Sequence, residues 1–210
     1  MPDQQLTIWG RANSVNVQKV LWGLAELGLP FERIDAGMAF GVVETPAYRA
    51  LNPNGRIPTL EDDGYVLWES NTIVRYLSMK HGLGSLCPSD LLARFEAERW
   101  MDWQLTTLDR PLRTVFWALV RTPPEQRDLA AVEKAQAEAE QALAILDAHL
   151  AQRRFVGGEA FTMGDIPVGA SVYRWLALDL QRADRPQVRR WYERLTERPG
   201  FREHVMQPLS

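Results

Sequence analysis

The first 35 residues constrain the fold most, because they place two short apolar strands on either side of one amphipathic helix. Residues 6–9 form an apolar run, and apolar side chains then recur at helical spacing over residues 15–27 until Gly28 ends the pattern. Residues 31–34 alternate apolar and polar side chains, as a second strand does. A strand–helix–strand crossover is right-handed in nearly all proteins and leaves its two strands parallel. The sequence therefore predicts an α/β start.

A short helix, a β-hairpin and a longer helix follow this unit. Residues 45–51 are helical in pattern, and the turn sequence NPNG comes next. Two apolar segments, residues 57–60 and 65–68, then flank the turn Asp-Asp-Gly as the strands of a hairpin do. Ser70 can cap the helix that begins directly after the second segment. The predicted order of elements is therefore βαβαββα.

The character of the chain changes at the segment HGLGSLCPSD, residues 81–90, which is a linker rich in Gly, Pro and Ser. No convincing strand pattern occurs beyond it. Four helical patterns follow, over residues 91–120, 124–150, 163–178 and 186–198. Pro111 is expected to bend the first of these helices. We therefore predict an α/β domain over residues 1–80 and an all-α domain over residues 91–210.

One helix of the second half has a recognisable start. Thr162 can cap its first turn, and Asp165, three residues later, can reach back to the amide of the capping residue. This arrangement is a variant of the capping box. We assign the pair to folding rather than to chemistry.

The composition excludes several classes of function. The net charge of −3, with no basic cluster, gives no electrostatic case for nucleic acid or for an acidic membrane. No apolar run reaches about 18 residues, and the start MPDQQ lacks the features of a signal peptide, so a cytoplasmic protein is expected. The single cysteine, Cys87, rules out an internal disulfide and is interpreted as an inert or surface thiol. Because the three histidines are far apart in sequence, no metal is expected.

Taken in order, the βαβ unit, the Ile-Pro strand start, the hairpin, the Glu-Ser helix start and the all-helical second half resemble a soluble glutathione S-transferase. The resemblance is to bacterial members of the serine type, either theta-like or nu-like. Its most specific part is NPNGRIPTLEDDGYVLWESNTIVRYL, residues 52–77, and the cap at Thr162 is the family's usual signal in the second domain. The resemblance implies a thioredoxin-like domain followed by an all-helical domain, glutathione as co-substrate, and a homodimer.

The same resemblance assigns a role to five residues around glutathione. Pro58 matches the family's cis-proline, which turns the backbone of Ile57 toward the cysteinyl part of the ligand. Glu69 matches the acceptor of the γ-glutamyl ammonium. Ser70 and the amides of its helix start match the donors to the adjacent carboxylate. Arg56 can attract the glycyl carboxylate, or it is a solvated charge in a turn.

The stretch RANSVNVQK, residues 11–19, lies where the first strand meets the first helix. Taken alone, its Ser and Asn side chains are explained as helix caps. In the family fold this stretch reaches the glutathione sulfur, and Ser14 falls where serine-type members have their catalytic hydroxyl. Asn16 follows at the spacing found in bacterial relatives that reduce disulfides with bound glutathione, and Asn13 is a third candidate. Any of the three can contact the sulfur.

Three functions therefore stay open. The first is transfer of glutathione to a small hydrophobic electrophile, with Ser14 as donor to the sulfur. The second is glutathione-dependent reduction of a disulfide or peroxide, with Asn16 sharing the role. The third is a non-catalytic binding or interaction module. For the electrophile, aromatic side chains on the inner faces of the helices are expected to supply a surface, namely Trp100, Trp103, Phe116, Trp117, Tyr173 and Trp175.

Overall fold

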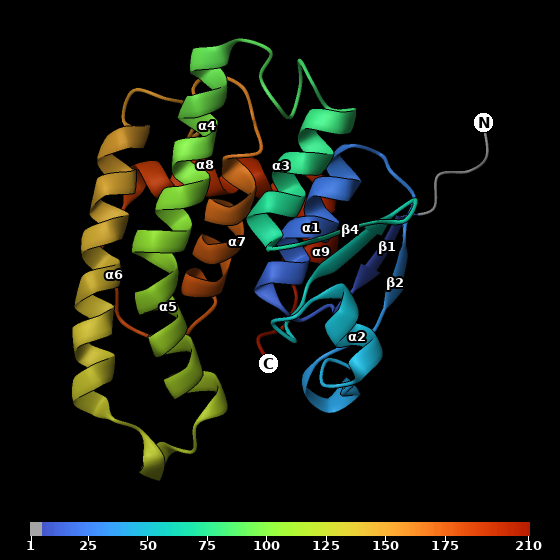
Figure 1. Ribbon diagram of the computed structural model, residues 1–210. Coiled ribbons are helices and arrows are strands. Elements are labelled where there is room, and N and C mark those ends of the chain that lie inside the picture. The colour runs from blue at the N-terminus through green and yellow to red at the C-terminus, as the bar shows by residue number, and fades with distance from the viewer. Residues whose placement is uncertain (1–5) are drawn as a thin grey trace.

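The structure, a computed structural model, describes residues 6–210 and has a small mixed sheet on one side of the molecule and a group of helices on the other (Figure 1). The four strands are β1 (Leu6–Trp9), β2 (Glu32–Ile34), β3 (Thr59–Asp62) and β4 (Tyr65–Trp68). Their order in the sheet is β2-β1-β3-β4. β1 runs parallel to β2 and antiparallel to β3, and β3 forms a hairpin with β4. The predicted α/β start and hairpin are confirmed.

The helices of the first half are α1 (Val15–Glu26), α2 (Pro46–Leu51) and α3 (Ser70–His81), with a short 3₁₀ turn, η1 (Met38–Phe40). α1 and α3 pack on each other and lie between the sheet and the helical half (Figure 1). α1 is therefore buried on more than one side, which explains why eight consecutive residues, from Val17 to Leu24, are buried.

The second half is entirely helical over the described residues. Its α-helices are α4 (Leu91–Trp103), α5 (Asp109–Phe116), α6 (Leu129–Leu150), α7 (Asp165–Leu176), α8 (Pro186–Thr196) and α9 (Pro199–His204). A short 3₁₀ turn, η4 (Pro124–Gln126), precedes α6. α7 contacts α1, α4 and α5, so it forms the centre of this half. The sequence did not predict α9 as a separate helix.

The predicted single helix over residues 91–120 is interrupted twice. The π-helical segments η2 (Gln104–Leu108) and η3 (Trp117–Arg121) precede and follow α5. Pro111 has no amide hydrogen to donate to the carbonyl one turn earlier, and that carbonyl lies within η2. The expected disturbance at Pro111 therefore takes the form of a wider turn before the proline.

Two further predictions are corrected or refined. Pro58 was expected to head a strand over residues 57–60, but β3 begins one residue after it. Cys87 is fully buried rather than exposed, and burial raises the pKa of its thiol, which leaves it an unreactive group.

The N-terminal residues MPDQQ, used above to argue against a signal peptide, lie outside the described residues. In the part that the structure describes, no helix is long and apolar enough to cross a membrane.

Asp165 organises the start of α7 as the capping pattern predicts. Its carboxylate accepts the backbone N–H of Thr162 at 2.9 Å, and it also accepts the N–H of Val156 at 3.0 Å and the indole N–H of Trp191 at 2.9 Å. Burial raises the pKa of Asp165 to about 6, although these hydrogen bonds act in the opposite direction. The carboxylate therefore joins three separate segments of the helical half.

Asp165→Ala should lower the free energy of unfolding by at least about 3 kcal/mol, because three buried N–H groups lose their acceptor and each such loss costs roughly 1–3 kcal/mol. Chemical denaturation at pH 7 measures the change. Asp179→Ala, at an exposed position, is the matched control and should change stability by less than about 0.5 kcal/mol. Equal effects of the two substitutions would contradict the structural role of Asp165.

Candidate functional site

Ser14 lies at the N-terminus of α1, and its hydroxyl makes no hydrogen bond within residues 6–210. Its backbone has the extended conformation of an N-cap residue, with φ −86° and ψ 123°, yet its side chain accepts no capping hydrogen bond from the first turn. The residue is 8% exposed and lines a pocket. A buried hydroxyl normally finds a partner, so the capping explanation of Ser14 fails and its hydroxyl is available to a group in the pocket.

Asn16 lines the same pocket from the first turn of α1. The hydroxyl of Ser70 donates to its Oδ1 at 3.3 Å, which connects the starts of α1 and α3. Because the oxygen of this amide already accepts a hydrogen bond, its NH₂ group is the part that remains to donate. No hydrogen bond from that NH₂ occurs within residues 6–210.

Asn13 is separated from the other two. It is only half-buried, it does not line the pocket, and its Nδ2 donates to the hydroxyl of Ser210 at 2.6 Å. Of the three candidates for contact with a sulfur, the fold therefore brings Ser14 and Asn16 together and turns Asn13 toward the end of the chain.

The Ile57–Pro58 peptide bond is cis and lies beside the end of β1. A Cβ atom at Gly10, which follows β1, would be 3.3 Å from the Cβ of Ile57 and 2.4 Å from a methyl group of Val17. This position therefore requires glycine. Gly10 and Ile57 are far apart in sequence, yet this short distance shows that Ile57 lies against the junction of β1 and α1.

The side chain of Arg56 is exposed and makes no hydrogen bond or ion pair within the described residues. Its carbonyl oxygen, in contrast, accepts hydrogen bonds from the Tyr48 hydroxyl at 2.7 Å and from Asn52 Nδ2 at 2.9 Å. The backbone at Arg56 is therefore fixed while its guanidinium faces solvent.

Glu69 and Ser70 form the start of α3. Glu69 has φ 71° and ψ 110°, a conformation that residues with a Cβ rarely adopt and that costs on the order of 1–3 kcal/mol. Its side chain is exposed, and Ser70 next to it is 7% exposed. Such backbone outliers persist where the surroundings hold them, and they occur often at ligand sites. In the described part of the chain the Glu69 carboxylate makes no hydrogen bond or ion pair, and it lies next to the N-terminal amides of α3.

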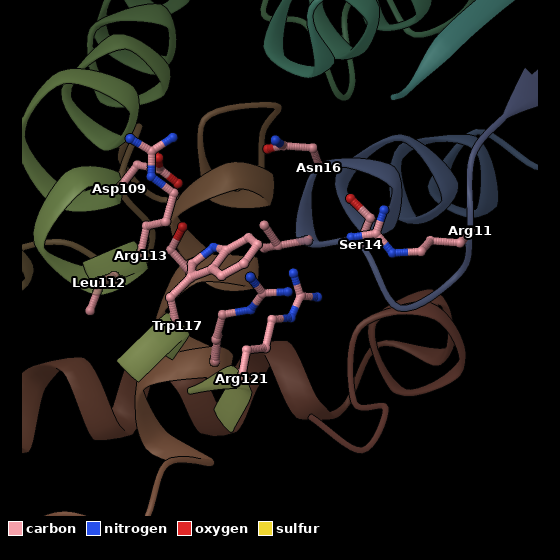
Figure 2. Close-up of a pocket in the computed structure, with 11 residues that line it drawn as sticks. Arg11, Ser14, Asn16, Asp109, Leu112, Arg113, Trp117 and Arg121 are labelled. Carbon is pink, nitrogen blue, oxygen red and sulfur yellow. The ribbon is translucent and has the colours of Figure 1, made fainter. Parts of the chain in front are cut away.

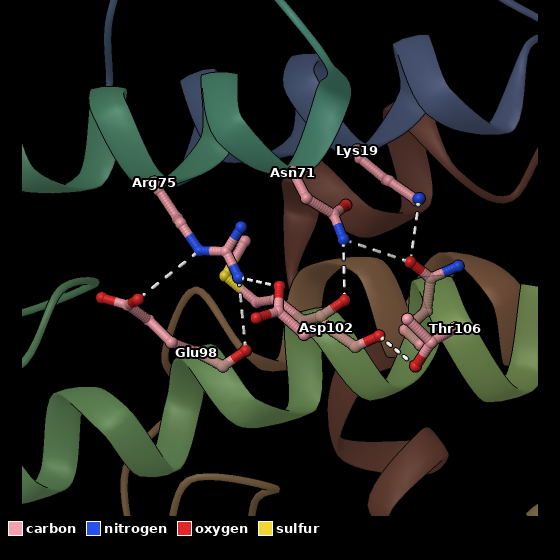
Figure 3. Close-up of polar contacts among 8 residues, drawn as sticks. Lys19, Asn71, Arg75, Glu98, Asp102 and Thr106 are labelled. Atoms are coloured by element: carbon pink, nitrogen blue, oxygen red, sulfur yellow. Dashed lines mark hydrogen bonds and ion pairs between the residues drawn. The ribbon is translucent and has the colours of Figure 1, made fainter.

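A buried polar network joins α1, α3 and the helical half (Figure 3), and it reaches the pocket through Ser171. Lys19 is fully buried and its Nζ donates to Gln104 Oε1 at 3.1 Å. Asn71 donates to the same oxygen at 3.3 Å, and Gln104 Nε2 donates to the hydroxyl of Ser171, which lines the pocket. Burial lowers the pKa of Lys19 to about 8. A cation is thus held in this network without a carboxylate in hydrogen-bond contact.

The pocket has a volume of about 140 Å³, and four of the eleven residues that line it are arginines. Its lining includes Arg11 from the loop before α1 and three arginines of the helical half, Arg113, Arg121 and Arg174. Figure 2 shows Arg121 and Trp117 on one side and Ser14 with Arg11 on the other. The sequence analysis missed these arginines. The signal available was the four-residue spacing of Asp109, Arg113, Trp117 and Arg121, which places them on one face of a helix.

The aromatic residues expected to form a surface for the electrophile lie mostly outside this pocket. Of the six aromatic residues proposed for it, Trp117 alone lines this pocket. Trp100, Phe116 and Trp175 are buried in the core. The hydroxyl of Tyr173 donates to the carbonyl oxygen of Gln207. Aromatic residues at helical spacing serve the core in most proteins, and they do so here.

The sheet order, the cis bond at Ile57–Pro58 and the helical second half define a thioredoxin-like domain joined to an all-helical domain. The model of the glutathione S-transferase N-terminal domain matches residues 4–79, and that of the glutathione S-transferase C-terminal domain matches residues 130–194. The chain belongs to the glutathione S-transferase family and is a glutathione transferase.

Individual relatives agree with this assignment over nearly the whole chain. The glutathione S-transferase GstB of Escherichia coli (strain K12) is 45% identical over 98% of this chain and 100% of its own. Glutathione S-transferase 3 of Zea mays is 31% identical over 95% of this chain and 93% of its own. The crystal structure of the theta class enzyme of Xanthomonas axonopodis pv. citri, with glutathione bound, has a TM-score of 0.95 and 45% identity, covering 100% of both chains.

Lys19→Met should reduce the rise of stability with pH above neutrality. The folded-state pKa of Lys19 is about 8, against 10.5 for an unperturbed lysine. Below pH 8, Lys19 is protonated in both the folded and the unfolded state, and the folded state carries the full cost of burying its charge. Between pH 8 and 10.5 the unfolded state binds more protons than the folded state, so the free energy of unfolding rises with pH. The wild type should gain about 3 kcal/mol more than the variant over this range, as measured by urea denaturation at several pH values. Equal pH profiles would contradict the buried charge.

Proposed function

We propose that the hydroxyl of Ser14 donates a hydrogen bond to the glutathione sulfur and stabilises the thiolate for attack on an electrophilic carbon. The observation that supports this most is that Ser14 is buried at a helix N-terminus, lines the pocket and does not cap its own helix. The thiolate is the nucleophile, whereas the free thiol, with a pKa of about 8.5, is mostly protonated at neutral pH.

The expected shift of the thiol pKa follows from the two contacts. A hydrogen bond to a charged group contributes roughly 1.5–3 kcal/mol, and a helix N-terminus contributes roughly 0.3–1 kcal/mol. One pKa unit corresponds to about 1.4 kcal/mol. Together the two contacts lower the thiol pKa by about one to three units, which makes the thiolate abundant near pH 7.

The rest of glutathione is proposed to bind along the sheet half. The backbone of Ile57, held by cis Pro58, pairs with the cysteinyl part, Glu69 takes the γ-glutamyl ammonium, and Ser70 with the α3 amides takes the adjacent carboxylate. Arg56 is free to attract the glycyl carboxylate. The crystal structure of the Xanthomonas relative contains glutathione, which supports glutathione as the ligand of this chain. The reaction calls for glutathione as co-substrate and for no metal.

Reduction of a disulfide is a second proposed activity, and Asn16 supports it. Its NH₂ group lies in the same pocket as Ser14 and is free to donate to the same sulfur. In this reaction the bound thiolate attacks one sulfur of the disulfide, and the other sulfur leaves as a thiolate that takes a proton from solvent. The thiolate of a second glutathione then attacks the glutathione sulfur of this mixed disulfide, which forms oxidised glutathione and releases the remaining substrate sulfur as a thiolate that takes a proton from solvent.

A cytoplasmic homodimer is the proposed state of the protein, with residues 1–80 and 91–210 as its domains and residues 81–90 as the linker. Large apolar side chains exposed on α3 and α4 support an interface there, namely Met79, Leu91, Leu92 and Phe95. Sedimentation velocity at several concentrations should give a dimer, and Leu92→Glu should shift it toward the monomer. A wild-type protein that stays monomeric at all concentrations would contradict the dimer.

Ser14→Ala should raise the pKa of bound glutathione by about one to two units toward its free value, because the thiolate loses one charge-assisted hydrogen bond. The measurement is an ultraviolet titration of thiolate absorbance in the presence of saturating glutathione. The rate constant for conjugation near pH 7 should fall with it.

Ser14→Thr is the matched control, since it keeps the hydroxyl and should keep the lowered pKa. Asn16→Ala separates the two candidate donors. If Ser14→Ala leaves the titration unchanged while Asn16→Ala raises the pKa, Asn16 holds the sulfur and the assignment of Ser14 is wrong. If the protein binds glutathione normally but turns over no electrophile or disulfide, both proposed activities are wrong and the protein is a non-catalytic binding module.

A further inference from the structure

The pocket beside Ser14 is strongly cationic although the chain as a whole is acidic. Four guanidinium groups line it against one carboxylate, that of Asp109. The net charge of the whole chain is −3. This local excess of positive charge therefore does not reflect the average composition, and it lies next to the residues proposed to hold the reacting sulfur.

These arginines have no carboxylate side chain within ion-pair distance in residues 6–210, whereas seven other arginines of that range do. The Nε of Arg11 is buried without any hydrogen-bond partner. Arg174 stacks on the ring of Phe116 with its guanidinium carbon 4.0 Å from the ring centre. Arg121 donates to the backbone oxygen of Ser210 at 2.8 Å. Packing and a backbone contact hold Arg174 and Arg121 in place, and no carboxylate side chain of residues 6–210 forms an ion pair with any of the four arginines.

The arginines also repel one another. Burial, followed by the positive charge of Arg121, lowers the pKa of both Arg11 and Arg174, the latter to about 10. Half-buried cations close enough to perturb one another destabilise the empty pocket. A bound anion offsets this repulsion and satisfies the guanidinium donors.

The anion is not one of the two ends of glutathione on the proposed binding mode. Ser14 and Asn16, which face the sulfur, line the pocket. Glu69, Ser70 and Arg56, which are assigned to the γ-glutamyl and glycyl ends, do not line it. The arginine group therefore lies beyond the sulfur, where the second substrate has to approach.

We propose that the second substrate is a small electrophile that bears a carboxylate, and that Arg113, Arg121 and Arg174 bind this carboxylate while Arg11 adds positive charge. The proposal rests on the role of Ser14 proposed above. The volume of about 140 Å³ suits a compound of a few carbon atoms, in which the electrophilic carbon and the carboxylate are close together. A 2-halo carboxylate has this form. It replaces the hydrophobic electrophile expected from the sequence.

The reaction is a displacement at the carbon next to the carboxylate. The thiol has already lost its proton to solvent. The thiolate then forms the S–C bond, and the C–halogen bond breaks with the electron pair leaving on the halide. No oxidant, reductant or metal is needed. Fixing the carboxylate orients the carbon toward the sulfur, which is the usual contribution of a bidentate arginine contact.

The test compares bromoacetate with bromoacetamide, which share the leaving group and nearly the same size but differ in charge. Each rate is divided by the uncatalysed rate with glutathione. In the wild type this ratio should be at least about tenfold larger for bromoacetate. Arg174→Gln, and separately Arg113→Gln at an exposed position, should lower kcat/KM for bromoacetate about tenfold while leaving bromoacetamide and the KM for glutathione within about twofold.

Arg110→Gln is the matched control, because Arg110 lies exposed on the same helix, α5, and does not line the pocket. It should change neither substrate. If the wild type accelerates both substrates equally, or if the arginine variants lower both equally, the proposed anion site is wrong while Ser14-dependent transfer stands. If neither substrate nor any other electrophile is conjugated, the proposed function itself fails.

Discussion

The position of α1 between the sheet and the helical half is the constraint on which the rest of the structure depends. Trp22, near the middle of α1, is fully buried. Added Cβ atoms at Gly169 on α7 and at Gly200 on α9 would lie only 3.1 and 3.2 Å from its side chain. Because both neighbouring helices approach α1 this closely, the helix has no freedom to shift along its axis. Its N-terminus, and hence Ser14, is fixed by packing that lies two turns away.

The site follows from that fixed helix start. The hydrogen bond between Ser70 and Asn16 sets α3 against α1, and the network around Gln104 connects both helices to the helical half (Figure 3). Lys19 adds a buried positive charge to this network. Binding groups for the two ends of glutathione thus come from the sheet half, and the arginines come mainly from the helical half. A glutathione thiolate at Ser14 would therefore lie between the groups that bind glutathione and the arginines that line the pocket.

The sequence predicted the parts of this arrangement that depend on local pattern. Strand alternation, helical periodicity and the turn at residues 62–64 place β1, α1 and the hairpin correctly, and Asp165 reaches back to Thr162 as the capping pattern requires. The sequence could not predict the π-helical segments. Helices are predicted from the spacing of apolar side chains, and one extra residue in a turn barely changes that spacing. The arginine group was missed for another reason: Arg11 and Arg174 lie far apart in sequence and converge only in the fold.

A crystal structure with S-(carboxymethyl)glutathione, the conjugate of a 2-halo acetate, tests the central claim most directly. The account predicts that the sulfur lies within hydrogen-bonding distance of the Ser14 hydroxyl and that the added carboxylate contacts Arg174 or Arg113. Both observations come from one experiment and depend on neither reaction rates nor variants. A sulfur held by Asn13, away from Ser14, with the carboxymethyl group in solvent, would contradict the account.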